Sequence, residues 1–347
     1  MRVGVQQPSA CGEVLAQDAA WTWSGIGLCC AALGLLLASA LASLLIGEIS
    51  VSVHQVMEAL VKHGGSQAEM VVWTLRVPRV VVGVLAGACF AVSGALMQGM
   101  TRNPLADPTL TGVSAGAACA IVAAQVLWPT LAVSMHPLLG IAGGLVAATL
   151  TFALAWRERL SPIQLALAGL AVTAFATAGI TTLLIVSGPD AASLFFWLSG
   201  GLAGRSWTQV ALLLPWALAG MVLAWLCAKP LNIMALGDDA THTLGLNVGL
   251  WRMACGLAAV MLAAGAVAVA GPLGFVGLCV PHIARLCVGN DHQRLLWVSA
   301  LLGAALVCAA DLLARTVAAP RELPAGFLTA LIAAPLLIKL VHKREAA

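Results

Sequence analysis

Long apolar runs separated by short polar breaks dominate the sequence. Ten runs approach the roughly 20 residues that a helix needs to cross a bilayer. They lie near residues 21–46, 78–99, 109–130, 136–156, 163–187, 208–228, 252–270, 273–288, 295–313 and 325–341. The eighth run is short and contains Pro281, so we expect it to be kinked or to span only in part. A further piece, 193–202, is too short to cross and is expected at the membrane interface. The pattern predicts an all-α polytopic membrane protein with ten transmembrane helices.

Composition supports this prediction. Of the 347 residues, 61% are hydrophobic and 9% are charged. A soluble domain averages about 25% charged residues, so this chain could not cover a surface that faces water. The first 20 residues are polar and do not resemble a cleaved signal peptide. We therefore expect an N-terminal tail over 1–20, a membrane domain over 21–341 and a C-terminal tail over 342–347.

Ten crossings would place both termini on one side. Loops on that side hold 11 of the 17 basic residues, and loops on the other side hold 6. The positive-inside rule then predicts that both termini are cytoplasmic, in the inner (plasma) membrane of a bacterium. The polar break between the sixth and seventh runs, about 229–251, would be cytoplasmic as well.

The chemistry that the predicted spans lack narrows the function. No span has an acidic residue near its middle, which argues against an ion-coupled secondary carrier. The chain has no GxxxxGK[ST] phosphate loop, so energy for uphill transport would have to come from another chain. No nucleophile, acid pair or metal cluster indicates an intramembrane enzyme. The ten cysteines show no CxxC spacing and lie mostly in apolar runs; we expect no metal site, no cofactor and no disulfide framework.

The segment "ALGDDATHTLGL" (235–246) is polar within an apolar chain. Gly237 is expected at the turn, Asp238 and Asp239 in the first turn of a short helix, and Gly245 at its C-cap. Helical spacing then predicts a small apolar face made of Ala240, Thr243 and Leu244. Such a short helix is not stable alone. It either packs on its own bundle or docks into a groove on a partner.

This segment resembles the coupling-helix motif of the FecCD family of ABC importer permeases, which transport iron–siderophore complexes, haem and cobalamin. Further segments match in the same order: "LRVPRVVVGVLAGACFAVSGALMQGMTRNPLADPTLTGVSAGA" (75–117), "LALAGLAV" (165–172), "GPLGFVGLCVPHIARL" (271–286), "DHQRLL" (291–296), "ADLLAR" (310–315) and "ELPAGFLTALIAAP" (322–335). The resemblance covers about 50–340. It implies the type II ABC importer permease fold, with a pair of short coupling helices between spans 6 and 7.

The resemblance also implies partners. They are a second permease subunit, identical or different, two cytoplasmic ATPase subunits and a periplasmic binding protein; no nucleic acid is expected. The chain would be a transport subunit with no catalytic residues of its own. The expected ligand is an iron(III)-siderophore complex, with haem or cobalamin as the alternative within the family.

Site residues follow from the matched motifs. The ATPase contact is expected at Gly237, Asp238, Asp239, Ala240, Leu244 and Gly245. Contacts with the binding protein are expected at Arg76, Arg79 and Arg315, with Arg76 directed outward because Pro78 would hold the chain extended. Anchoring of helix ends at lipid headgroups is the alternative for these arginines.

A cytoplasmic gate is expected at Asn103, Leu105, Pro162 and Ile163. In "RNPLADP" the residues Asn103 and Asp107, each followed by Pro, also read as helix-start signals in a stiff turn. Pro162-Ile163 departs from the small polar residue that some family members have, which leaves the polarity of this gate open. Ser93, Gly94 and Gln98 were further candidates to face the pathway.

Overall fold

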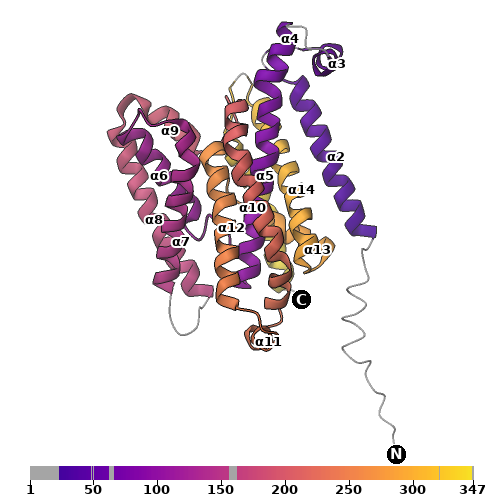
Figure 1. The fold of residues 1–347 in the computed structure, drawn as a ribbon. Helices are drawn as coiled ribbons and strands as arrows, with labels where there is room; N and C mark the ends of the chain where they lie inside the picture. Colours follow the sequence, from indigo (N-terminus) through magenta and orange to yellow (C-terminus); the bar gives the residue numbers. More distant parts are fainter. Residues whose placement is uncertain are drawn as a thin grey trace, which may run out of the picture.

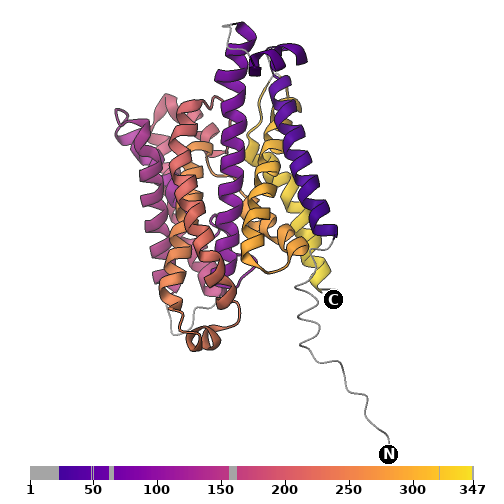
Figure 2. The ribbon, with the colours of Figure 1, turned by 45° about the vertical axis from the view of Figure 1, so that its right-hand side comes forward.

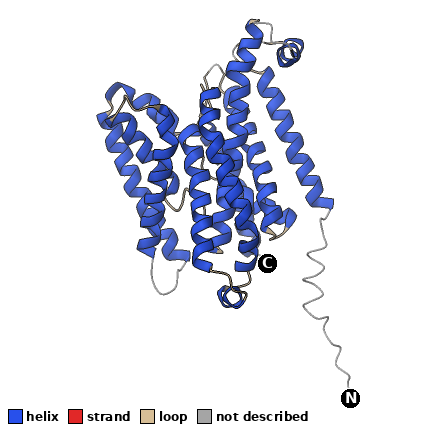
Figure 3. Cartoon of the chain, viewed as in Figure 1, coloured by secondary structure: helices blue, strands red, loops and turns tan. Residues whose placement is uncertain are grey.

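The computed structural model describes residues 23–47, 49, 51–61, 66–155, 162–319 and 321–345, and every regular element in these ranges is helical (Figure 3). The expected tail 1–20 lies outside the described residues. The helices are α2 (Trp23–Leu45), α3 (Val53–Val61), α4 (Gln67–Met70), the π-helical turn η1 (Val71–Arg76), α5 (Val77–Thr101), α6 (Val113–Leu127), α7 (His136–Ala155), α8 (Pro162–Val186), α9 (Ala191–Leu198), α10 (Trp207–Met234), α11 (Asp238–Thr243), α12 (Val248–Ala270), α13 (Val276–Val288), α14 (His292–Thr316) and α15 (Ala325–Glu345), with 3₁₀ turns η2 (Val133–Met135) and η3 (Gly188–Asp190).

Each of the ten predicted runs corresponds to one of these helices. In the described part of the chain, seven helical segments are long and apolar enough to cross a membrane. The other three apolar helices are shorter: α6, α13 and the stretch Ala325–Pro335 of α15. The 13 residues of α13 rise about 20 Å at 1.5 Å per residue, less than the ~30 Å hydrocarbon layer. The polytopic membrane fold is confirmed, and the count of ten complete crossings stays a prediction.

The helices form an elongated bundle around α5 (Figure 1). Helix α5 packs against α10, α12, α13 and α14, while α6, α7 and α8 pack on one another to one side. Helices α3 and α4 lie at one end of the bundle, here called the α3 end, and α11 lies at the opposite end, the α11 end. Helix α2 begins and α15 finishes at the α11 end (Figure 2). The two ends of the described chain thus share one side, as an even number of crossings requires.

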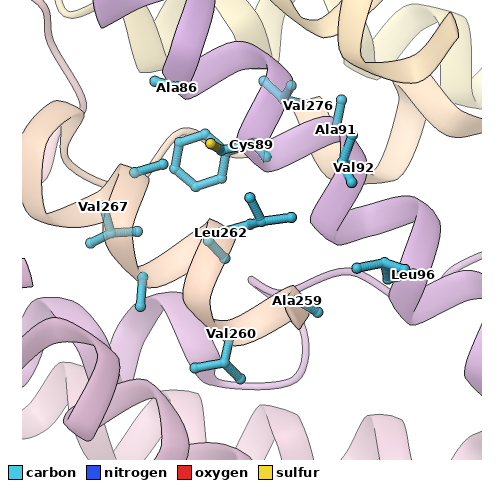
Figure 4. Packing of buried hydrophobic residues seen from close by; sticks show 14 of the residues in the cluster. Ala86, Cys89, Ala91, Val92, Leu96, Ala259, Val260, Leu262, Val267 and Val276 are labelled. Carbon is cyan, nitrogen blue, oxygen red and sulfur yellow. The ribbon is translucent and has the colours of Figure 1, made fainter. Parts of the chain in front are cut away.

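Small side chains allow close packing in the centre of this bundle. Small side chains of α5, such as Ala86 and Ala91, and of α12, such as Ala259, lie together in this core (Figure 4). A Cβ atom added to Gly87 would lie 2.3 Å from the carbonyl oxygen of Gly303 in α14, so only hydrogen fits there. Such contacts replace the hydrophobic driving force that helices lack within lipid.

The segment before α5 differs from the prediction. Residues Gln67–Thr101 form one continuous helical stretch, and the chain is not extended before Pro78. The N–H of Val77 bonds to the carbonyl of Val72, five residues back, as in a π turn. Pro78 then occupies the first turn of α5, where its missing N–H is tolerated.

The polar loop between α10 and α12 and the non-helical C-terminal tail are both shorter than expected. Helix α10 continues through Pro230 to Met234, and the side chain of Asn247 caps α12 by accepting from the N–H of Leu250 at 3.1 Å. The polar loop is therefore 235–247 and not 229–251. At the C-terminus, α15 continues to Glu345, so most of the expected tail is helical.

Candidate functional site

The polar loop 235–247 holds one short helix, α11, where a pair was expected. Gly237 precedes it with φ +113°, a conformation that glycine adopts without strain. Thr241 is fully buried, and its hydroxyl donates to the carbonyls of Gly237 at 2.6 Å and Ile233 at 3.2 Å. Because Ile233 belongs to α10, these bonds fasten α11 to the end of that helix.

Gly245 ends this helix as predicted. Its φ is +77°, and the N–H of Leu246 donates back to the carbonyl of Thr241 at 3.2 Å. This is the backbone arrangement of a Schellman C-cap, which satisfies carbonyls that the helix leaves unpaired. The C-cap prediction is confirmed, and α11 is closed at both ends by glycine turns.

Among the side chains of the loop that the structure describes, two leucines are well exposed. Leu236 is 67% exposed and Leu244 is 63% exposed, while Ala240 is half-buried. Asp238 and Asp239 begin α11, but their side chains lie outside the described part. One segment thus combines a buried polar anchor with exposed leucines at the tip of the bundle, which is unfavourable in water unless another surface covers them.

Three predicted gate residues line one groove at the same end. Asn103, Leu105 and Ile163 border an open groove of about 490 Å³, together with residues of the loop 106–111 and of the first turns of α8. Leu105 is 51% exposed and Ile163 is 72% exposed. Pro162 starts α8 beside them. The structure thus brings together residues 60 positions apart in the sequence, in a lining that is mainly apolar.

The loop between α5 and α6 is a series of turns. Asn103 Oδ1 accepts from the N–H of Leu105 at 2.9 Å, and Asp107 accepts from the N–H of Thr109 at 2.9 Å and from its hydroxyl. Asp107 is 2% exposed, and this burial raises the pKa of its carboxyl. The two Asx-Pro signals therefore form turns, and neither starts an α-helix. Their side chains bond to the backbone two residues on, which is the usual Asx-turn alternative.

Arg76 at the α3 end does not project outward, contrary to our expectation. It is 5% exposed, and its guanidinium donates to the carbonyls of Leu44 at 2.5 Å and Leu45 at 3.1 Å, and to that of Ile49. These carbonyls lie at and beyond the C-terminus of α2, where helical acceptors have no partner of their own. The physical reason for the difference is that α2 ends next to η1 and needs a donor there.

Arg79 and Arg315 are also held by their own chain. Arg79 forms a bidentate pair with Asp311, at 3.0 Å and 2.9 Å, and a second pair with Glu322 at 2.8 Å. Arg315 lies 3.6 Å from Asp311 and reaches the carbonyls of Ser43 and Ile46 at 3.4 Å. The side chains of Arg79 and Arg315 are 12% and 7% exposed. We call these residues, with Arg76, the outer cluster.

Ser93 and Gln98 do not face an open pathway. Ser93 is fully buried and donates to the carbonyl of Ala259 at 2.6 Å. Gln98 is 3% exposed and donates to the carbonyl of Leu278 at 3.1 Å. Gly94 is buried against Gly277 of α13. All three hold α5 against α12 and α13, because a buried polar side chain must find a partner.

Comparison with known proteins decides the family. The sequence model of the FecCD transport family matches residues 35–343. The chain belongs to the FecCD transport family. It is 42% identical over 272 residues to the Fe(3+) dicitrate transport system permease protein FecD of Escherichia coli K12, covering 78% of this chain and 85% of that protein. It is 41% identical over 279 residues to the cobalamin import system permease protein BtuC of Halobacterium salinarum, covering 80% and 75%.

A solved structure agrees with this FecCD assignment. A metal-chelate type ABC transporter in an inward-facing conformation superposes with a TM-score of 0.78 at 29% identity, covering 91% of this chain and 99% of that one. Membership and fold together make the chain a multi-span permease subunit of an ABC importer, a transport subunit that works with further subunits.

Sequence reasoning missed several residues that shape these sites in this FecCD chain. Thr241 and Asn232 are polar residues next to apolar runs, which is a usable signal. The partners of Arg79 are 232 and 243 residues away along the chain, so no local pattern could reveal them.

Proposed function

We propose that this chain forms the membrane pathway for an iron(III)-siderophore complex in a bacterial inner membrane, with both termini in the cytoplasm. The proposal rests on family membership and on relatives named for iron(III) dicitrate among others. The pathway would lie between this chain and a second permease subunit. Two ATPase subunits would bind below, and a periplasmic binding protein above.

The loop 235–247 carries this proposal, as the contact with an ATPase subunit. Its buried Thr241 gives α11 a fixed position on α10, and its exposed Leu236 and Leu244 give it a surface to cover. Gly237, Asp238, Asp239, Ala240 and Gly245 complete the proposed contact. A short helix held firmly at the end of α10 can transmit a displacement to the bundle. A loosely attached loop would move without displacing the bundle.

The groove between the 103–111 loop and α8 fits the proposed cytoplasmic gate. Asn103, Leu105, Pro162 and Ile163 lie on the α11 end, the side proposed to be cytoplasmic. The exposed leucine and isoleucine would meet the matching residues of a second subunit and close a narrow apolar passage. An apolar constriction suits a bulky ligand because it offers few specific contacts to slow release.

The outer cluster is proposed to bind acidic residues of the binding protein. Because its arginines are already paired within the chain, this binding would require an exchange of ion pairs. Arg79 pairs with Asp311 and Glu322, and Arg315 lies next to Asp311, so docking would require an incoming acid to compete with these carboxylates. Glu322 is the partner with the larger exposed fraction, 29% for its side chain, and is the one that an incoming acid could replace. Charges at the rim of a protein–protein contact mainly affect orientation and capture rate.

The direct test is transport by the complete complex in proteoliposomes. The permease, its ATPase and its binding protein would be reconstituted and supplied with ⁵⁵Fe-labelled ferric hydroxamate, ferric dicitrate or haem, or with radiocobalt-labelled cyanocobalamin. We expect ATP-dependent uptake of a ferric chelate. Uptake of only haem or cobalamin would select the alternative ligand within the family, and uptake driven by an ion gradient without the ATPase would overturn the importer mechanism.

Gly237 offers a paired test of coupling. A Cβ atom added there meets no atom within 4 Å, so Gly237→Ala tests only the backbone strain of the positive φ. Gly237→Glu adds a bulky charge in the proposed ATPase contact. We expect Gly237→Glu to reduce transport at least tenfold with normal membrane insertion, and Gly237→Ala to retain most transport. Equal activity of the two variants would argue against the contact.

A further inference from the structure

A hydrogen-bonded cluster of Asn232, Asp291 and the buried His292 links the end of α10 to the start of α14. The side chain of Asn232 donates through Nδ2 to Asp291 Oδ1 at 2.7 Å. Its Oδ1 accepts from the backbone N–H of His292 at 2.8 Å and lies 2.8 Å from His292 Nδ1. Because the carboxylate fixes the amide orientation of Asn232, Nδ1 of His292 must be the donor in that contact.

The other ring nitrogen of His292 is the unusual atom. Nε2 is buried and has no hydrogen-bond partner in the structure. It faces Gly99 of α5, where an added Cβ atom would lie 2.7 Å from Nε2. His292 as a whole is 6% exposed. An apolar side chain would fill the same space without an unpaired nitrogen, so packing alone does not explain a histidine here.

The two sides of this ring lead to the two proposed functional segments. On one side, Asn232 is the residue before Ile233, whose carbonyl holds the Thr241 anchor of α11. On the other side, the carbonyl of Gly99 accepts from the N–H of Arg102, at 3.4 Å, at the C-cap of α5. Asn103, the first residue of the proposed gate, follows directly.

We propose that His292 is a positioning residue that transmits movement of the α11 loop to the 103–111 loop. Its Nδ1–H follows the end of α10 through Asn232, and the opposite edge of its ring presses on the last turn of α5. This inference rests on the proposed function, and it adds the route by which the ATPase contact reaches the gate.

The last turn of α10 is suited to this role. Pro230 lies two residues before Asn232 and lacks the N–H that would bond to the preceding turn. The last turn of α10 is therefore less tied to the rest of its helix, while Asp291 at the N-cap of α14 holds it from the side. A shift of α11 would move this turn against His292 before it moved the rest of α10.

Two substitutions of His292 each keep the contact on one side of the ring and remove the contact on the other side. His292→Asn places an amide nitrogen where Nδ1 was, which keeps the bond to Asn232 but removes the ring edge next to Gly99. His292→Gln places a nitrogen near the former Nε2 and loses the bond to Asn232. Gln293→Ala is the matched control, because that side chain makes none of the bonds described above.

The readout is hydrogen–deuterium exchange of the assembled permease–ATPase complex, with and without a non-hydrolysable ATP analogue. In the unmodified complex we expect nucleotide to change exchange in both 235–247 and 103–112. In each His292 variant we expect the change in 235–247 to remain and the change in 103–112 to fall at least fivefold. The Gln293→Ala complex should respond like the unmodified one.

The possible results separate the two proposals. If the unmodified complex shows no nucleotide-dependent change in 235–247, the proposed ATPase contact fails, and the inference fails with it. If both segments respond and either folded His292 variant keeps the full response in 103–112, the inference alone is overturned. Co-purification of the ATPase and a normal size-exclusion profile show that a variant is folded, and one folded variant is enough for the decision.

Discussion

The two ends of the bundle treat their proposed partner residues in opposite ways. At the α3 end, the arginines are buried and bonded within the chain, Arg79 to Asp311 at 2.9 Å and Arg76 to carbonyls of α2. At the α11 end, Leu236 and Leu244 are more than half exposed, as are the groove residues Leu105 and Ile163. The α3 end thus holds its proposed partner residues within its own chain, whereas the α11 end leaves its proposed partner residues exposed for another molecule to cover.

This difference distinguishes residues that stabilise the fold of the chain from residues that contact partner subunits. A side chain that is paired within its own chain contributes mainly to the stability of the fold, and its loss is felt without any partner. An exposed apolar side chain contributes little to the fold and matters when a partner is present. Substitutions at the two ends should therefore affect different measurements.

The largest effect is expected for Asp311→Ala. It removes the carboxylate between Arg79 and Arg315 and leaves both guanidinium groups buried with weaker pairing. Breaking a buried ion pair from one side costs about 3–5 kcal/mol. A clear fall in the melting temperature of the detergent-purified permease would be measured by tryptophan fluorescence. The same melting temperature as in the unmodified chain would contradict the stabilising role of the outer cluster.

The next effect is expected for the double variant Leu236→Glu and Leu244→Glu. Both side chains are exposed, so the isolated permease should unfold at nearly the same temperature as before. Co-purification of the ATPase subunit should fall at least tenfold, because charges would enter an apolar contact. Val61→Glu, at a residue 78% exposed on α3 at the opposite end of the bundle, is a control for the added charge on an exposed apolar site. Full ATPase binding by the double variant would remove the loop from the interface.

A smaller effect is expected for Glu322→Gln, at the partly exposed edge of the outer cluster. Neutralising Glu322 leaves Arg79 with one carboxylate partner and makes it easier for an incoming acid to bind. An ion pair near the surface contributes about 0.2–1 kcal/mol, so affinity for the loaded binding protein should rise about 1.4- to 5-fold. Surface plasmon resonance on permease in nanodiscs would measure it. Weaker binding would show that Glu322 itself, and not the released arginine, faces the binding protein.

The most local effect, without a change in transport or in overall stability, is expected for Gly245→Ala. Its φ of +77° costs an L-residue about 1–2 kcal/mol, and the strain falls on a six-residue helix. Faster hydrogen exchange at the amide of Leu246 should result, with no change in the overall melting temperature. Gly249→Ala, where an added Cβ meets only Asn247 at 3.5 Å, should leave that amide unchanged. Equal exchange in both variants would mean that the Schellman turn does not limit opening of the loop.

The sequence predicted the elements well and their contacts poorly. All ten apolar runs are helices, because a run of that length and composition has few other folds in lipid. The C-cap at Gly245 was also predictable, since its signal is local. In contrast, most positions of α5 are apolar all round its circumference, so its periodicity could not show which side chains face α12 or α14.

The contacts that the sequence did not predict share one physical property. Arg76 is held by carbonyls 27 to 32 positions earlier, and the direction of its side chain depends on where α2 stops. His292 has no local signal in the sequence, because its contacts depend on the meeting of α10, α14 and α5. Such partners are set by tertiary packing, which overrides the local reading that Pro78 suggested.

The contact between Gly87 and Gly303 has a mechanical consequence. At this contact the backbones of α5 and α14 touch with no side chain between them that could change rotamer to let them slide, and the salt bridge of Arg79 with Asp311 fastens the pair near the α3 end. These two helices should move as one rigid body during each transport cycle. The relative movement of helices that opens a passage then has to occur elsewhere. We expect it where α6, α7 and α8 contact the group of helices that includes α5 and α14.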